Sequence, residues 1–169
     1  MLIPHRGQEG QDNGGQMPEN ARQLLQCGLY AEAYILLEQA IRKAPQDASV
    51  HFNMGLCLLF VGQAERAVQV LDQGLDILSA GVLPREAVGE PGIVDALAKA
   101  QANNGSYTAP MHGFETKQFP RRCRERFLRL IVNACVLTGD RERIERIADM
   151  LQSKHYHNVE EAQLMVLEE

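Results

Sequence analysis

A 34-residue spacing between residues of similar kind constrains this chain more than any other feature of its sequence. The interval separates four pairs: Gly28 and Gly62, Ala33 and Ala67, Leu37 and Leu71, and Ile41 and Leu75. A period of this length is typical of a helix–turn–helix unit, whose two helices cannot bury their apolar sides alone and must stack on a neighbouring unit. Pro45 follows the first unit and ends its second helix, because proline cannot continue a helix. The stretch from Gly28 to Leu78 therefore predicts an all-α protein, a short antiparallel helix–turn–helix repeat stack.

Composition agrees with closely packed helices and gives no general indication of binding to nucleic acid or insertion into a membrane. Aromatic residues make up 5% of the 169 residues and tryptophan is absent, so aliphatic residues, alanine and methionine must fill the core. The net charge of −5 gives no general electrostatic reason to bind nucleic acid. The N-terminus lacks the apolar core of a signal peptide, and no apolar segment approaches the length of a membrane span, so we expect no membrane insertion and a cytoplasmic location.

The four cysteines carry no pattern of a disulfide framework or a metal site. Cys27, Cys57, Cys123 and Cys135 include no Cys-x-x-Cys pair. Each lies in or beside a predicted apolar helix, where a free cysteine behaves as a small buried hydrophobe. We expect reduced core cysteines.

Helical periodicity and helix-breaking residues place the predicted elements. Pro18 and Pro120 suit the first position of a helix, and Asp47 (or Ser49) and Asn158 suit the capping position. Residues 1–16 are rich in Gly, Gln and Asp and predict a flexible tail. The predicted helices span residues 18–26, 30–43, 47–61, 64–78, 93–102, 120–138, 141–152 and 159–167.

The period breaks after Leu78. The next glycine turn with good helical flanks is Gly139, which follows Gly62 by 77 residues and leaves 43 residues beyond one period. We interpret this excess as an irregular central insertion with one short helix; a degenerate third repeat is the alternative. The predicted organisation of the single domain is 17–46 (repeat 1), 47–79 (repeat 2), 80–118 (insertion or degenerate repeat), 119–153 (repeat-like helix pair) and 158–168 (capping helix).

The helix predicted at 47–61 has two apolar stripes, more than a single neighbouring helix can cover. One stripe contains His51, Met54, Gly55 and Leu58, and a second contains Phe52, Leu56, Leu59 and Phe60. Asn53 is the strongly polar residue on the remaining side. A helix that is apolar almost all round must be covered on more than one side. We expect the chain to cover the second stripe itself, for example with Phe114 of the insertion, or with a second subunit; the alternative is a groove for an amphipathic helix of a partner.

These residues resemble the tetratricopeptide repeat family, whose signature places small and large apolar residues at set positions of two helices. The matching positions are His51, Met54-Gly55, Leu58, Ala67 and Leu71 in the second repeat, with Ser79 where proline would stand; Met17, Asn20-Ala21, Leu24, Ala33, Leu37 and Pro45 in the first; and Leu128, Ile131-Val132, Cys135, Ile144 and Ala148 around Gly139. The resemblance implies a protein–protein interaction module without enzyme activity or cofactor. It also implies a concave groove, lined by the first helix of each repeat, that binds an extended peptide or a helix. One subset of the family binds chaperone carboxyl termini through Lys and Asn, but Phe52 and Leu56 stand at the groove positions of repeat 2.

Two sets of residues are predicted to bind the partner. The first is the apolar stripe of Phe52, Leu56, Leu59 and Phe60. The second is a stripe of Arg122, Arg126, Arg129 and Asn133 along the helix at 120–138. Guanidinium groups pair with carboxylates in bidentate geometry, so this stripe favours an acidic peptide or a chain terminus. The alternative is a set of arginines paired internally with Glu or Asp.

We therefore expect a non-catalytic adaptor or scaffold that binds a partner peptide or helix on its concave face, with a homodimer as a further possibility. A dedicated chaperone for a secreted or membrane-associated client is the alternative within binding proteins. An enzyme or small-molecule sensor using residues 80–124 is the alternative of another class, since His112 and Cys123 flank the insertion. No residue is predicted to orient that pair, and His155 and His157 lack a third metal ligand.

Overall fold

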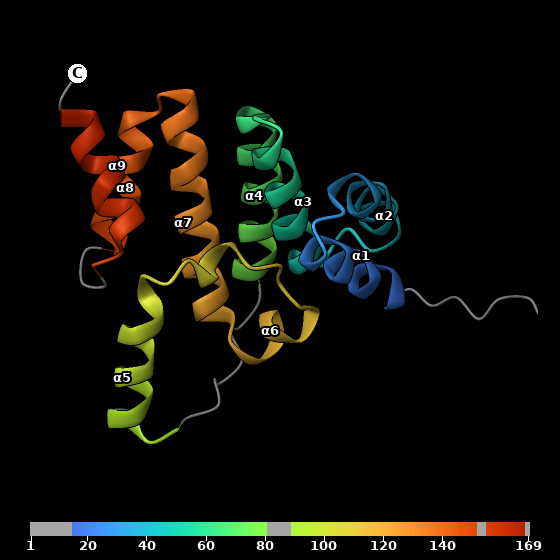
Figure 1. Cartoon of the computed structure of the whole chain (residues 1–169), viewed down its shortest axis with the longest axis horizontal. Coiled ribbons are helices and arrows are strands. Elements are labelled where there is room, and N and C mark those ends of the chain that lie inside the picture. Colours follow the sequence, from blue (N-terminus) through green and yellow to red (C-terminus); the bar gives the residue numbers. More distant parts are fainter. Residues whose placement is uncertain (1–14, 81–88, 152–154, 168–169) are drawn as a thin grey trace, which may run out of the picture.

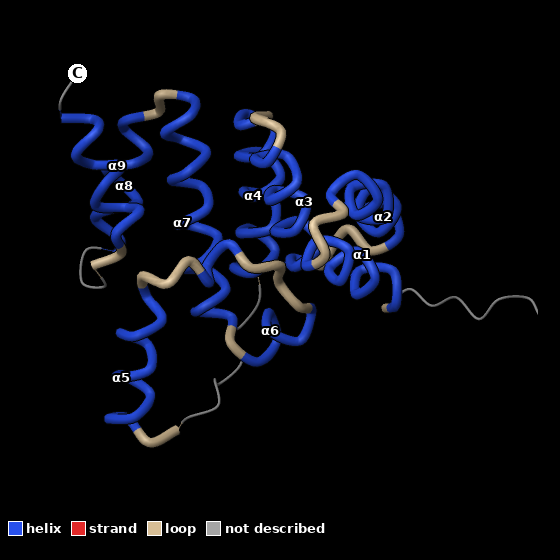
Figure 2. Tube along the Cα trace, in the orientation of Figure 1, coloured by secondary structure: helices blue, strands red, loops and turns tan. Residues whose placement is uncertain are grey.

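A computed structural model describes residues 15–80, 89–151 and 155–167, and no strand occurs among them (Figure 1, Figure 2). The predicted all-α repeat stack is confirmed. Antiparallel helix pairs are formed by α1 (Gln16–Gln26) with α2 (Tyr30–Lys43), α3 (Ala48–Phe60) with α4 (Ala64–Ser79), and α7 (Pro120–Thr138) with α8 (Arg141–Leu151). The insertion contains α5 (Pro91–Ala102), the 3-10 helix η1 (Ser106–Thr108) and α6 (Gly113–Gln118), and α9 (His157–Leu167) packs against α7 and α8.

A glycine in the left-handed conformation closes each helix pair. Gly28, Gly62 and Gly139 have φ angles of 76°, 74° and 72°. Only glycine adopts this conformation without a steric cost, and it lets the chain reverse directly after a helix. The glycine turns that define the sequence period are therefore the turns of the structure.

Most predicted helix ends lie within two residues of the observed ones. The predicted cap at Asp47 is confirmed, because its carboxylate Oδ1 accepts a hydrogen bond of 3.0 Å from the backbone N–H of Ser49. The prediction for Asn158 is wrong, since α9 already begins at His157 and the Asn158 side chain bonds to α7 instead. Residues 1–14 of the predicted tail lie outside the described part of the chain, and Gln16 already belongs to α1.

The insertion leaves the stack after α4 and returns at α7, which packs directly against α4 (Figure 1). The predicted short helix corresponds to α5, which has no buried residue. The sequence did not predict α6. Its six residues are too few for a helical period, and its start is fixed by a capping box in which His112 Nδ1 accepts from Phe114 N–H and Glu115 Oε1 accepts from His112 N–H.

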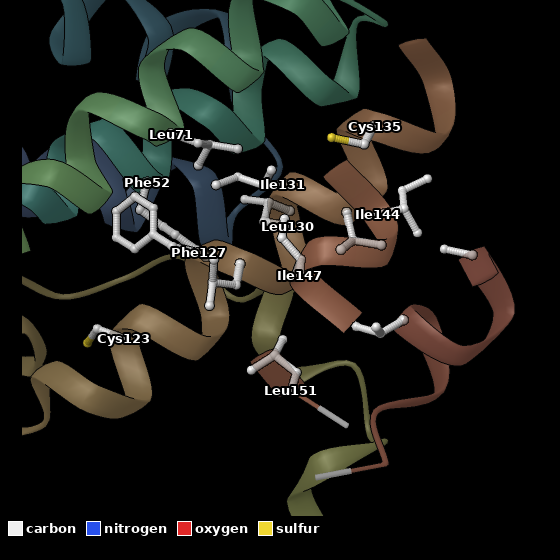
Figure 3. Packing of buried hydrophobic residues seen from close by; sticks show 14 of the residues in the cluster. Phe52, Leu71, Cys123, Phe127, Leu130, Ile131, Cys135, Ile144, Ile147 and Leu151 are labelled. Atoms are coloured by element: carbon white, nitrogen blue, oxygen red, sulfur yellow. The ribbon is translucent and has the colours of Figure 1, made fainter. Parts of the chain in front are cut away.

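Helix α3 contributes to two hydrophobic clusters, one on each of its sides. Val50 and Met54 belong to the cluster formed with α1 and α2, and Phe52 belongs to the cluster formed with α4 and α7–α9 (Figure 3). The rings of Phe52 and Phe127 meet edge to face, with centroids 5.1 Å apart and planes at 75°. The second cluster therefore joins repeat 2 to the C-terminal helices.

Gly74 allows α4 and α7 to approach closely. A Cβ atom at this position would lie 2.6 Å from Cε1 of Phe127 and 2.8 Å from Cβ of His51. Both distances are shorter than non-bonded carbon atoms tolerate, so any side chain here would move α7 or α3 away from α4.

The predicted consequence is that Gly74→Ala destabilises the protein, despite the better helix propensity of alanine. Overpacking of this kind costs about 1–3 kcal/mol of unfolding free energy. Gly92→Ala in α5 is the matched control, because a Cβ atom there would meet no other part of the described chain within 4 Å, and we expect it to leave stability equal or higher. Urea unfolding followed by circular dichroism measures both. Equal stability of the two variants would contradict the close approach at Gly74.

Glu19 of α1 is held as a carboxylate by neighbouring donors. Its oxygens accept hydrogen bonds from Arg22 Nη2 at 2.6 Å and Nε at 2.8 Å, and from Gln23 Nε2 at 3.1 Å. Nε2 of His112 lies 3.0 Å from Glu19 Oε2. The hydrogen bond from Arg22 is the main reason why the pKa of Glu19 falls from 4.5 to about 2.

A lowered carboxylate pKa stabilises the folded state above the unfolded pKa, and this contribution is lost as the pH falls from 4.5 towards 2. We therefore expect Glu19→Gln to lower the unfolding free energy at pH 7 by up to about 1 kcal/mol, as is usual for a partly exposed ion pair. The difference from wild type should shrink between pH 4.5 and pH 2. Denaturant titrations at several pH values measure it, and a difference independent of pH would exclude this role of the carboxylate.

Candidate functional site

The first helices of the three pairs, α1, α3 and α7, line one hollow, and part of the insertion bonds to α3 and α7 beside it. We call the face that these three helices form the concave face and residues Tyr107–His112 the strap. The hollow beside the strap has a volume of about 300 Å³. Its lining comes from α1–α3, α7 and the strap region: Leu25, Tyr30, Leu56, Leu59, Phe60, Thr108, Pro110, Leu130, Asn133 and Leu137.

The hollow is apolar and open to solvent. Phe60 stacks on Tyr30 with ring centroids 4.0 Å apart and planes at 3°, yet 65% of Phe60 remains exposed. Leu137 of α7 is 63% exposed. Asn133 is the amide that contributes to this lining. Apolar side chains from two separate helix pairs are thus presented to solvent around one concavity.

Asn53 of α3 binds the main chain of the strap. Its Oδ1 accepts a hydrogen bond of 2.7 Å from Met111 N–H, and its Nδ2 donates one of 2.9 Å to the Met111 carbonyl. Asn53 is buried, and Met111 is only 1% exposed. The side-chain amide of Asn53 therefore satisfies both main-chain polar groups of Met111. Buried without hydrogen-bond partners, these two groups would destabilise the folded state by several kcal/mol.

Arg126 of α7 binds the strap at two further carbonyls. Its Nε donates to the Tyr107 carbonyl at 3.4 Å, and its Nη2 donates to the carbonyl of Ala109. Nη1 lies 2.9 Å from Glu115 Oε2, and the guanidinium carbon is 4.8 Å from the Phe52 ring centroid. Burial lowers the pKa of Arg126 from its ordinary value, and the Glu115 carboxylate opposes this effect. Arg126 remains a cation, because its intrinsic pKa is far above neutral pH.

Arg129 lies between two tyrosine rings. Its guanidinium carbon is 3.9 Å from the centroid of Tyr107 and 4.1 Å from that of Tyr156. Its Nε donates to Asn158 Oδ1 at 2.9 Å. Burial lowers the pKa of Arg129, and the neighbouring tyrosines oppose the shift. Arg129 thus ties the strap and α9 to α7.

Asn133 and Asn158 complete this polar network. Asn133 Nδ2 donates to the Tyr107 hydroxyl at 3.0 Å, and Asn133 Oδ1 accepts from Asn158 Nδ2 at 3.0 Å. The Tyr156 hydroxyl donates to Glu125 at 2.6 Å. Burial is the largest cause of the raised pKa of Tyr156, and the hydrogen bond to Glu125 adds to it.

The four residues of the predicted apolar stripe lie in two different environments. Leu56, Leu59 and Phe60 line the hollow, whereas Phe52 is fully buried beneath α7. The second stripe is buried, as expected, at Phe52. This side chain shares a hydrophobic cluster with Phe127 and Met111. The suggestion that Phe114 covers it is wrong, because Phe114 is 52% exposed and lies beside His112.

The three arginines of the predicted stripe line one small pocket of about 110 Å³ beside Tyr107 and Tyr156. Arg126, Arg129 and Asn133 contact the strap, and Arg122 is exposed, with its guanidinium carbon 6.0 Å from the Phe119 ring. The sequence prediction did not include Asn53, Tyr107, Met111 or Leu137. Asn53 carried a usable signal, because a polar residue inside an apolar helix needs a partner when it is buried.

The other residues considered for chemistry have structural neighbours. His112 Nδ1 accepts from Phe114 N–H, so its proton lies on Nε2, which faces Glu19. Cys123 is buried in the core. The described residues bring together no group of three His, Cys, Asp or Glu side chains that could hold a metal ion. None of the described helices combines the length and apolar character needed to span a membrane.

Comparison with known proteins identifies the repeats. A tetratricopeptide repeat family profile matches residues 24–78, which comprise the end of α1 and all of α2 to α4 up to Leu78. Searches of curated proteins and of solved structures found no match. The matched segment, its glycine turns and its paired helices agree with one another. The family match supports a tetratricopeptide repeat protein, with the recognised repeats at residues 24–78.

Proposed function

We propose that this protein is a non-catalytic adaptor that binds an apolar segment of a partner protein in the hollow between α3 and α7. Tetratricopeptide repeats generally mediate protein–protein interactions and are typically not catalytic. The concave face, the apolar partner segment and the adaptor role are our proposal for this chain.

The exposed apolar lining of the hollow is the observation that carries the proposal. Leu56, Leu59 and Phe60 approach from α3 and Leu130 and Leu137 from α7. Val61, next to Phe60 in the sequence, is 64% exposed. Apolar surface that gathers around one concavity marks an interaction site more strongly than scattered exposed residues do.

The chemistry of the hollow favours a protein segment over a small polar ligand. Binding sites for small molecules place several convergent polar groups among apolar ones to orient the ligand. Here Asn133 already donates to Tyr107 and accepts from Asn158. An amphipathic helix or short apolar segment needs only pockets for its anchor side chains. Arg122 lies on α7 outside the hollow and lines a separate small pocket with Arg126 and Arg129.

Leu137→Asp should abolish partner binding while the fold is retained. The carboxylate would have to be desolvated against apolar anchors of the partner, so capture should fall at least tenfold. Leu164→Asp is the matched control, because Leu164 on α9 is 61% exposed, close to the 63% of Leu137, and lies outside the hollow. Quantitative affinity capture with wild type and both variants measures the effect, and circular dichroism verifies folding.

A photo-reactive phenylalanine analogue at position 60 tests the same site directly. Crosslinked peptides should contain aliphatic or aromatic side chains at helical spacing. Equal capture by Leu137→Asp and wild type would exclude the hollow as the binding site. Crosslinks to this chain alone, with a dimer mass in light scattering, would replace the proposed adaptor by a homodimer.

A further inference from the structure

We propose that the strap is an intramolecular ligand of the concave face, and that a partner displaces it with an extended peptide carrying an aromatic residue and, four positions later, an aliphatic one. This inference rests on the proposed function and describes the regulation of the same face. The strap occupies the part of the face that binds peptide main chain, and the hollow beside it is open. Access of an extended peptide to the whole face therefore requires the strap to leave.

The strap is extended after η1, whereas Tyr107 and Thr108 are the last two residues of that 3-10 helix. Ala109 has φ −66° and ψ 144°, and His112 has φ −87° and ψ 143°. The carbonyls of Tyr107, Ala109 and Met111 all accept hydrogen bonds from side chains of the first helices. From Ala109 to Met111 this alternation is that of an extended chain, in which every second residue faces the same way.

The groups that hold the strap recognise main chain more than sequence. Asn53 pairs with both the N–H and the carbonyl of one residue, and Arg126 donates to two further carbonyls. Every extended peptide offers the same polar groups at the same spacing. As in strand addition to a sheet edge, main-chain hydrogen bonds then provide affinity and side-chain pockets provide specificity.

Two side chains of the strap provide the specific contacts. The Tyr107 ring covers the Arg129 guanidinium, and its hydroxyl accepts from Asn133. Met111 inserts into the core cluster that contains Phe52. These anchors are four residues apart, which defines the spacing that a competing peptide must reproduce.

The strap is not the main connection between the repeats. Helix α7 packs against α4 directly, and Met111 of the strap adds one side chain to the cluster that joins repeat 2 to the C-terminal helices (Figure 1). On the N-terminal side of the strap, α5 has no buried residue. On the other side, His112 caps α6 and faces Glu19 of α1. The contacts with Asn53, Arg126, Arg129 and Asn133 therefore hold the strap in place.

The test uses the full-length chain and a fluorescein-labelled synthetic peptide with its own sequence from Asn104 to Phe114. In wild type the attached strap competes with the added peptide. The double variant Tyr107→Ser/Met111→Ser removes both anchors of the strap and alters no residue of α1 to α9. Fluorescence anisotropy should show at least tenfold tighter binding of the peptide to the double variant than to wild type.

Two controls assign the peptide to the face occupied by the strap. Adding Asn53→Leu to the double variant should abolish the gain, because both hydrogen bonds to the peptide main chain are lost. A labelled peptide with serine in place of Tyr107 and Met111 should not bind. If circular dichroism shows that the double variant does not fold, Tyr107→Ser alone keeps Met111 buried and should still give a gain of about threefold.

Equal peptide binding by wild type and the folded strap variants, or binding by neither, would overturn the proposal and make the strap a fixed part of the core. This assay does not involve the cellular partner, so its outcome is separate from that of Leu137→Asp. Loss of capture by Leu137→Asp without peptide exchange would remove the strap proposal and keep the proposed function. Peptide exchange with unchanged capture would remove the hollow as the partner site.

Discussion

The contact between Phe52 of α3 and Phe127 of α7 joins the two halves of this protein. It requires Gly74, since a Cβ there would occupy the space of the Phe127 ring. Helix α3 is apolar on two sides, and without α7 the face that carries Phe52 would be exposed. In a regular repeat stack the next helix covers this face after a short turn. Here the chain makes a long excursion and still returns to the same place, which indicates that burial of this face, more than chain connectivity, determines the position of α7.

The repeat part of the fold could be predicted because its signals are local and periodic. Gly28 and Gly62 mark the turns, and the spacing of apolar residues marks the helices. The need to cover a second face of α3 was also readable from its sequence. The identity of the cover was not, because a helical period shows which side is apolar and carries no information on which distant segment packs there. Phe114 was the nearer aromatic candidate, but Phe127 belongs to a long helix that can bury several residues at once.

The candidate site was predictable only where helices form it. Leu56, Leu59 and Phe60 follow the helical period and line the hollow. The arginines of α7 were found by the same reasoning, but their partners are in an extended segment that has no period to detect. Asn53 is the residue from which the strap could have been anticipated. A buried amide in an apolar helix needs both a donor and an acceptor, and the main chain of one extended residue supplies the two together.

An attached ligand changes how a partner must bind. A segment tethered next to its own site has an effective concentration in the millimolar range. If about one molecule in a hundred has the strap released, the apparent affinity of a competing peptide falls about a hundredfold. The hollow can offset this loss of apparent affinity, because Phe60 and Leu137 are accessible while the strap is in place. A partner with apolar anchors there is held beside the strap before it competes for Asn53 and Arg126, and the second step becomes intramolecular. A peptide without such anchors has to compete from solution, so in the proposed scheme the hollow selects which partners can open the rest of the face.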